Sequence, residues 1–206
     1  MNRLILIFFL LSPLSMQSHN ELCTIRKAGE NVYVSSQIDD HHEINYWFKK
    51  CMANDLFTFY RVSVTSGTTG TTVVNEAYSD NIGPFEIRGG GWCGGNHLFT
   101  DEKTQTAETF SIKLYADGQS ISSDTLLKAQ IIKLEVKNRI FNPLSAEQTG
   151  DKTYFTDTLC IENVNYTIRG NSIQVDLSHD YINRTPVIIT KYYGMQSMFK
   201  DENQLL

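Results

Sequence analysis

One glycine-rich segment, residues 89–97, contains side chains that could bind or transform a ligand. Five of its nine residues are glycine, and the others include Trp92, Asn96 and His97. So much glycine is costly in a regular strand, so the segment predicts a close backbone approach to a ligand, or Trp92 folded over a neighbouring sheet. Histidine titrates near neutrality and an amide holds hydroxyls or carboxylates, so His97 is a candidate general base and Asn96 a candidate ligand-binding residue. A structural, hydrogen-bonded role for His97 is the alternative.

A second segment, residues 191–199, places aromatic and amide side chains together near the end of the sequence. It contains Tyr192, Tyr193 and Gln196. Flat aromatic rings beside an amide suit a sugar ring, so these residues and Trp92 form a candidate glycan-binding platform. A C-terminal strand that sends Tyr193 into the core and Tyr192 outward explains the same pattern.

Two further side chains complete the candidate set for catalysis. His179 lies among Asp176, Asp180 and Tyr181 and is an alternative general base, although a turn at a strand end explains this cluster equally well. Tyr192 or Tyr193 would then be the acid. Arg88 would neutralise a substrate carboxylate.

The acidic and histidine-containing run at residues 39–43 has ligand types that metals prefer. On a strand, however, His41 and His42 point to opposite faces, so one metal would take Asp39, His41 and Glu43, or Asp40 and His42 with other ligands. We expect a solvated polar turn here and no metal site. Because the sequence also lacks a phosphate loop and the common hydrolase motifs, no cofactor is expected.

The first residues predict export. Arg3 precedes an apolar run at residues 4–11, which Ser12 and Pro13 end. This pattern is typical of a secretory signal and is too short to span a bilayer. We therefore expect residues 1–18 to be a signal peptide, the mature protein to be secreted or periplasmic, and no membrane span after it.

The net charge bears on the binding partners of the protein, and the cysteine content bears on disulfide formation. A net charge of −5 without a basic stripe argues against nucleic acid. Export would place four widely spaced cysteines where disulfides persist, so two disulfides are expected, with free thiols as the alternative. The candidates are Cys23, Cys51, Cys93 and Cys160.

The elements that must position these residues are predicted to be strands. Short runs rich in Val, Ile, Thr, Tyr and Phe are separated by Gly, Asn and Asp. Examples of such runs lie at residues 31–38, 56–65, 108–116, 131–136, 165–169, 172–177 and 187–193. We therefore expect one domain at residues 19–206, an all-β antiparallel sandwich of supersandwich or jelly-roll type with at most one short helix; a β-barrel is the alternative.

Particular strands and turns follow from local patterns. In residues 108–116, alternation puts Phe110, Ile112 and Leu114 on one apolar face. Asp-Gly at residues 117–118 and Gly-Asn at residues 170–171 predict two hairpins. Residues 42–52 and 124–136 fit either a helix or a strand.

Short segments resemble known protein groups. Residues 80–85, 91–97 and 192–199 resemble parts of uncharacterised β-rich proteins from bacteria and their phages, which implies an exported or phage-associated protein without implying an activity. Residues 134–143 are similar to strands of galactose-mutarotase-like supersandwich domains, found in sugar epimerases and some polysaccharide lyases. That resemblance favours a carbohydrate ligand.

Two functions therefore compete. One is a non-catalytic module that binds a glycan or another surface polymer through Arg88, Trp92, Asn96, Tyr192 and Gln196. The other is a carbohydrate-active enzyme of lyase or epimerase type, in which His97 or His179 and Tyr192 or Tyr193 are base and acid. A structural surface or virion-associated protein is a third possibility. The oligomeric state is left open.

Overall fold

A computed structural model describes residues 22–76 and 82–195 of the chain. The expected signal peptide and Gln196 lie outside these residues. Within them, no helix is long and apolar enough to cross a membrane.

The larger of the two main sheets has six antiparallel strands in the order β10-β1-β2-β3-β4-β5. Its central part is a meander in which consecutive strands pair. The strands are β1 (Cys23–Ala28), β2 (Asn31–Gln37), β3 (His42–Cys51), β4 (Leu56–Ser66), β5 (Gly70–Glu76) and β10 (Thr125–Ala129).

The second main sheet has five antiparallel strands in the order β15-β14-β11-β8-β9. They are β8 (Ala107–Ala116), β9 (Gln119–Ser120), β11 (Ile132–Phe141), β14 (Thr158–Arg169) and β15 (Ser172–Tyr181). Two small sheets accompany them. One pairs β12 (Ala146–Thr149) with β13 (Lys152–Phe155), and the other joins β16 (Ile189–Tyr192), β6 (Phe85–Ile87) and β7 (Gly91–Cys93).

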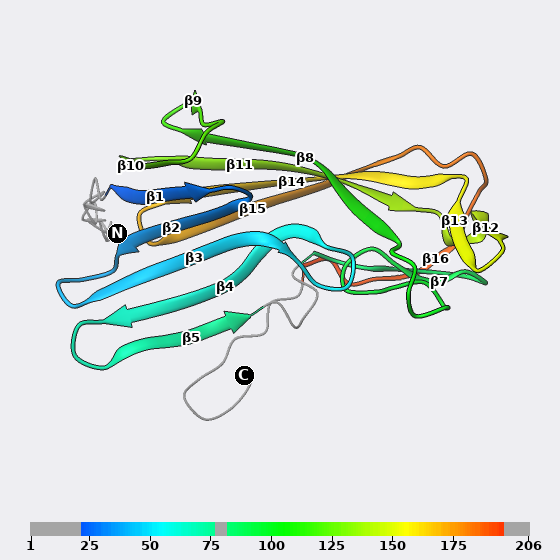
Figure 1. Cartoon of the computed structure of the whole chain (residues 1–206), viewed down its shortest axis with the longest axis horizontal. Coiled ribbons are helices and arrows are strands. Elements are labelled where there is room, and N and C mark those ends of the chain that lie inside the picture. The colour runs from blue at the N-terminus through cyan, green and yellow to red at the C-terminus, as the bar shows by residue number, and fades with distance from the viewer. Residues whose placement is uncertain (1–21, 77–81, 196–206) are drawn as a thin grey trace, which may run out of the picture.

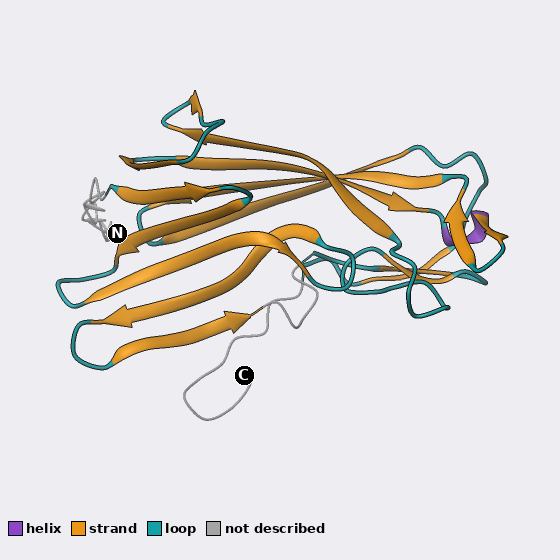
Figure 2. Ribbon diagram, viewed as in Figure 1, coloured by secondary structure: helices purple, strands orange, loops and turns teal. Residues whose placement is uncertain are grey.

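The two main sheets face one another, and the small sheets containing β7, β12, β13 and β16 gather at the end of the molecule away from the first described residues (Figure 1). Strands dominate, and a single 3₁₀ turn at Pro143–Ser145 is the one helical element among the described residues (Figure 2). The predicted all-β, sandwich-like fold with at most one short helix is therefore confirmed.

Aromatic side chains hold the two main sheets together. Phe48 from β3 and Phe59 from β4 both contact the fully buried ring of Tyr166 on β14, at centroid distances of 5.2 and 6.3 Å. The Tyr166 hydroxyl lies 2.9 Å from that of Thr58, so its polar atom is satisfied inside the core. Burial of these inward-facing residues leaves their neighbours along each strand on the outer faces.

The predicted hairpins are also confirmed. Asp117 and Gly118 both have positive φ in the turn between β8 and β9, and Gly170 begins the two-residue turn between β14 and β15. Both segments that fitted helix or strand form strands, namely β3 and the pair β10 and β11.

The predicted apolar face of residues 108–116 is wrong for Phe110 and Ile112. Leu114 is buried, but Phe110 is 46% and Ile112 36% exposed. A bulge explains Phe110: Ser111 pairs with Lys137 and Thr109 with Asn138, so Phe110 is left over between them. Its ring instead lies 5.2 Å from the Arg139 guanidinium.

The prediction of two disulfides is also wrong, because none of Cys23, Cys51, Cys93 and Cys160 is joined to another cysteine. Strand register is the reason, since none of the four has another cysteine as its cross-strand partner. All four are buried and act as small core side chains. Burial raises the pKa of Cys51 and of Cys93 to about 12.

Candidate functional site

The outer face of the six-stranded sheet has cationic and aromatic residues in a line across four strands. Arg26 on β1 is paired with Tyr33 on β2, Tyr33 with Trp47 on β3, and Trp47 with Arg61 on β4. We call these four residues the cation–aromatic row. Their alternation with the buried Ile25, Val32, Val34 and Phe48 places them on the outer face.

Direct contacts connect the members of this row. The rings of Tyr33 and Trp47 stack with centroids 5.2 Å apart. The Arg26 guanidinium lies 5.9 Å from the Tyr33 centroid, and the Arg61 guanidinium 5.8 Å from the Trp47 centroid. Such cross-strand stacks fix the side chains in place, so the row presents an ordered wall.

A second line of smaller polar residues runs beside the cation–aromatic row. Thr24, Ser35, Asn45 and Ser63 are successive cross-strand partners on the same four strands, and we call them the hydroxyl–amide row. The Asn45 amide nitrogen donates to the Thr65 hydroxyl at 3.0 Å. Within the described residues its Oδ1 accepts no hydrogen bond and is available to a ligand hydroxyl.

The two rows together line a cavity of about 390 Å³, which we call the outer trough. The hydroxyl–amide row forms its floor, the rings of Tyr33 and Trp47 a wall, and the exposed Leu126 of β10 also lines it. A volume of this size is in the range of small-ligand sites, which combine apolar surface with a few polar groups. The trough can therefore hold one or two rings of an amphipathic ligand.

A bulge adds another ring and an ammonium group to the wall. Trp47 pairs with Arg61 but Phe48 pairs with Phe59, so Tyr60 is an extra residue in β4. Its ring meets Trp47 edge-on at a centroid distance of 4.8 Å, and the Lys49 ammonium lies 3.7 Å from its centroid. The bulge thereby extends the aromatic surface beyond the row.

Sequence reasoning missed the outer trough. Period-two alternation marks Thr24 and Arg26, Tyr33 and Ser35, and Asn45 and Trp47 as outward-facing. Only the strand order and register show that these pairs share one surface, and the sequence does not provide either.

Comparison of the chain with protein-family models, with curated proteins and with solved structures gave no match.

The structure brings three predicted residues together in a second aromatic cluster, on the small three-stranded sheet. The Trp92 ring stacks on His97 at a centroid distance of 4.9 Å and contacts Tyr193 at 5.1 Å. The Lys191 ammonium lies 5.6 Å from the Trp92 centroid and 3.2 Å from Glu86. Protein groups thus already occupy much of the Trp92 ring surface.

Tyr192 and His179 meet in a third cluster. Tyr192 stacks on Phe85 at 4.7 Å, and His179 contacts both of those rings edge-on, at 5.2 and 5.1 Å. Burial, and secondarily the Glu162 carboxylate, raise the pKa of Tyr192 to about 12. Phe85 and Glu86 are neighbours on β6 and point to opposite faces, so this cluster and that of Trp92 lie on opposite faces of the small sheet.

His179 ends a buried polar row across the five-stranded sheet. Its Nε2 lies 3.1 Å from Oε2 of the fully buried Glu162, whose Oε1 accepts from Asn138 at 2.9 Å. The Thr109 hydroxyl donates to Asn138 at 2.6 Å and accepts from the backbone nitrogen of Phe57 in the facing sheet. A buried carboxylate is thereby satisfied on both oxygens, and a histidine is fixed at a sheet edge.

Other predicted site residues have different surroundings. Asn96 accepts a hydrogen bond from the Ala53 backbone nitrogen at 2.8 Å, which anchors the glycine-rich segment. Arg88 is exposed in the turn after β6, and its backbone nitrogen donates to Ile188. Gln196 lies outside the described residues.

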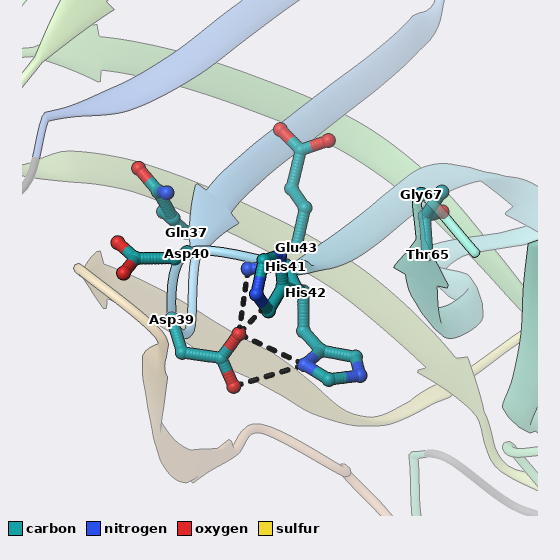
Figure 3. Close-up of a pocket in the computed structure, with 8 residues that line it drawn as sticks. All are labelled: Gln37, Asp39, Asp40, His41, His42, Glu43, Thr65 and Gly67. Atoms are coloured by element: carbon teal, nitrogen blue, oxygen red, sulfur yellow. Dashed lines mark hydrogen bonds and ion pairs between the residues drawn. The ribbon is translucent and has the colours of Figure 1, made fainter. Parts of the chain in front are cut away.

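Residues 39–41 lie in the turn between β2 and β3, and His42 and Glu43 begin β3 (Figure 3). Asp39 Oδ1 accepts from the backbone nitrogens of His41 and His42 and lies 2.9 Å from Nδ1 of His42. The His41 backbone bond is the largest cause that lowers the pKa of Asp39. The residues border a cavity of about 320 Å³, and no group of three potential metal ligands occurs in the described part of the chain.

Proposed function

We propose that this protein is an exported module that binds a saccharide polymer, and that the outer trough is its binding site. The observation that carries this proposal is the pairing of an aromatic wall with a floor of hydroxyl and amide groups. A saccharide ring presents C–H surface on its faces and hydroxyls around its edge. The wall and the floor match these two kinds of surface.

The outer trough supports binding better than the predicted Trp92 platform does. Protein groups contact both the Trp92 ring and the Trp47 ring, so ring contacts do not distinguish the two places. In the trough, Asn45 has an acceptor without a partner among the described residues, and the cavity already exists. The binding function stays as the sequence predicted it, whereas the site moves to another sheet.

Affinity electrophoresis of the mature protein, through native gels cast with neutral and acidic polysaccharides, tests the proposal. We expect retardation of the wild type and a loss of about tenfold or more in affinity for Trp47→Ala, because truncating a central aromatic anchor typically costs about 2 kcal/mol. Phe110→Ala removes an exposed ring from the other main sheet and should leave retardation unchanged. Equal retardation of Trp47→Ala and wild type would rule out the trough.

A second candidate function, a carbohydrate-active enzyme, is favoured by one contact. His179 and Tyr192, a predicted base and acid, lie in ring contact, and Glu162 holds the histidine. The high pKa of Tyr192 keeps its proton in place at neutral pH. Shortened polymer after incubation with the wild type, but not with His179→Ala, would support a lyase; epimerisation would appear as altered sugar composition at constant chain length.

Absence of retardation, shortening and epimerisation over the whole panel would count against both carbohydrate functions. A structural surface or virion-associated role would then be the better proposal.

A further inference from the structure

We infer that the polymer bound in the outer trough is acidic, and that Arg26 binds its carboxylate or sulfate groups. This inference rests on the proposed function. It adds the chemical class of the ligand and the residue that selects it.

Arg26 differs from Arg61, the other guanidinium of the cation–aromatic row. Arg61 donates to Glu76 at 2.9 Å, so its charge is balanced. Arg26 is exposed and forms no ion pair within the part of the chain that the structure describes; its contact is with the Tyr33 ring. A guanidinium at a cavity edge, with its fork of donors uncommitted, suits a planar or tetrahedral oxyanion.

Other cations on the same face add to the positive charge around the outer trough. Lys128 on β10 is the cross-strand partner of Thr24 in the trough floor, and Lys49 lies over the Trp47 and Tyr60 rings. Neither lysine forms an ion pair within residues 22–76 and 82–195. The chain as a whole has a net charge of −5. A locally positive trough on a negative protein orients an anionic ligand toward this face.

The acidic side of the same face limits where the anionic groups lie. Along β2 and β3 away from Arg26 come Glu43 and the turn with Asp39 and Asp40, which border the neighbouring cavity. Like charges repel there. The polymer's acidic groups should therefore lie at the Arg26 end of the trough, with its neutral hydroxyls toward Asn45.

Nucleic acid fits this face less well than an acidic saccharide. Binding to a phosphate backbone relies on many cations that each neutralise a phosphate. Here three cations, which form no ion pair with any described residue, stand beside a floor of hydroxyl and amide groups that matches ring hydroxyls. The test includes a nucleic acid so that this distinction is measured.

The experiment measures affinity electrophoresis with four probes: polygalacturonate, its carboxyl-reduced form, dextran sulfate and oligo-deoxythymidine. We expect the wild type to bind polygalacturonate or dextran sulfate about tenfold or more tightly than the carboxyl-reduced polymer, since hydrogen bonds to charged groups are among the stronger ones. The two acidic probes separate carboxylate from sulfate recognition. Raising NaCl to about 0.5 M should weaken acidic binding, because screening then acts over a few ångströms.

Single-residue variants test whether Arg26 is responsible for the preference for acidic polymers. Arg26→Ala should lose about tenfold in affinity for the acidic polymer and little for the reduced one, and Arg26→Lys should recover part of the loss. Arg169→Ala removes the same charge at the exposed end of β14 and should behave like the wild type.

The outcomes separate this inference from the proposed function. Equal binding of acidic and reduced polymers, with loss in Trp47→Ala, would overturn the acidic class and keep the saccharide site. Equal or tighter binding of oligo-deoxythymidine would also overturn it. Binding of no polymer would remove the proposed function itself.

Discussion

At the scale of single residues, the four cysteines show how burial decides chemistry. Each thiol lies in the core, and burial raises the pKa of Cys51 and Cys93 to about 12. The thiolate is the reactive form, so these groups are inert in the folded protein. An oxidising environment is therefore not enough for a disulfide to form, because the fold must also bring two cysteines close together.

A thiol titration with Ellman's reagent checks this assignment. We expect slow reaction of the folded protein, and release of all four thiols on adding denaturant without any reductant. Only two or no reactive thiols in denaturant would show that disulfides exist. A sample reduced beforehand is the control for the total.

The pair formed by Glu162 and His179 is the other residue-scale feature with large energetic consequences. Glu162 is fully buried, and removing the His179 ring that hydrogen-bonds to it leaves one oxygen of this buried carboxyl group unsatisfied. His179→Ala should therefore lower the free energy of unfolding by about 3 kcal/mol. Adding Glu162→Gln removes the unpaired charge and should recover part of that loss.

Urea unfolding measures these changes, with His41→Ala in the exposed turn as the control; it should stay within about 0.5 kcal/mol of the wild type. A His179→Ala variant as stable as that control would mean that the pair contributes little. The same variants, tested on polymers, separate stability from activity.

At the scale of elements, a close contact between the backbones of Gly83 and Gly194 determines how the small three-stranded sheet packs. A Cβ added to Gly83 would lie 1.7 Å from the carbonyl oxygen of Gly194, just after β16. Even alanine would push the two backbones apart. The glycine therefore allows β16, with Tyr192, to dock beside β6.

Gly83→Ala should destabilise the protein by about 1–3 kcal/mol, the range typical of overpacking. Gly67→Ala is a matched control, because nothing lies within 4 Å of an added Cβ there and its φ is not positive. Thermal unfolding of both variants is the measurement. Equal unfolding midpoints for the two variants would show that the two backbones can move apart at little cost in the free energy of unfolding.

Sequence patterns predicted elements more successfully than they predicted surfaces. Composition and turn residues located seven of the sixteen described strands and both hairpins, since β-branched runs and Asp-Gly or Gly-Asn turns act locally. The bulges at Phe110 and Tyr60 were not predictable, because a bulge shows only in the pairing of two strands. One bulge turned Phe110 outward, and the other added Tyr60 to the candidate site.

At the scale of the whole molecule, several carboxylates stabilise the fold in their ionised form. The pKa of Asp101 is lowered chiefly by the Thr104 hydroxyl, and that of Glu86 by the Thr190 hydroxyl. Asp101 also accepts from Thr153, so it connects its loop to β13. Among the described residues, the carboxyl groups with a lowered pKa are Asp39, Glu86, Asp101, Glu135 and Asp157.

A lowered folded-state pKa gives stability that is present above the unfolded value, about 4, and is lost as pH falls through the folded value. We therefore expect the urea midpoint to fall from about pH 4 downward. Asp101→Asn should flatten this dependence. Asp151→Asn, whose side chain accepts no hydrogen bond among the described residues, should not. An unchanged midpoint in acid would contradict the assignment.

The aromatic clusters on the small three-stranded sheet could be predicted in part, whereas the outer trough could not. The sequence indicated aromatic and amide side chains near Trp92 and Tyr192, and the structure does bring the two segments together on one small sheet. It gave no sign of the trough, because Arg26, Tyr33, Trp47 and Arg61 become neighbours only when four strands align. Residues that meet through register rather than spacing leave no local signature.

The place of β10 has a consequence for how the chain folds. The meander from β1 to β5 forms between consecutive strands, but the outer edge of β1 is covered only when Cys23 pairs with Ala129. During synthesis that edge stays open until β10 has been made, and closing so long a loop is slow. An unpaired edge is a template for association with other chains. Nascent or truncated chains that end before β10 are thus the forms most prone to aggregate.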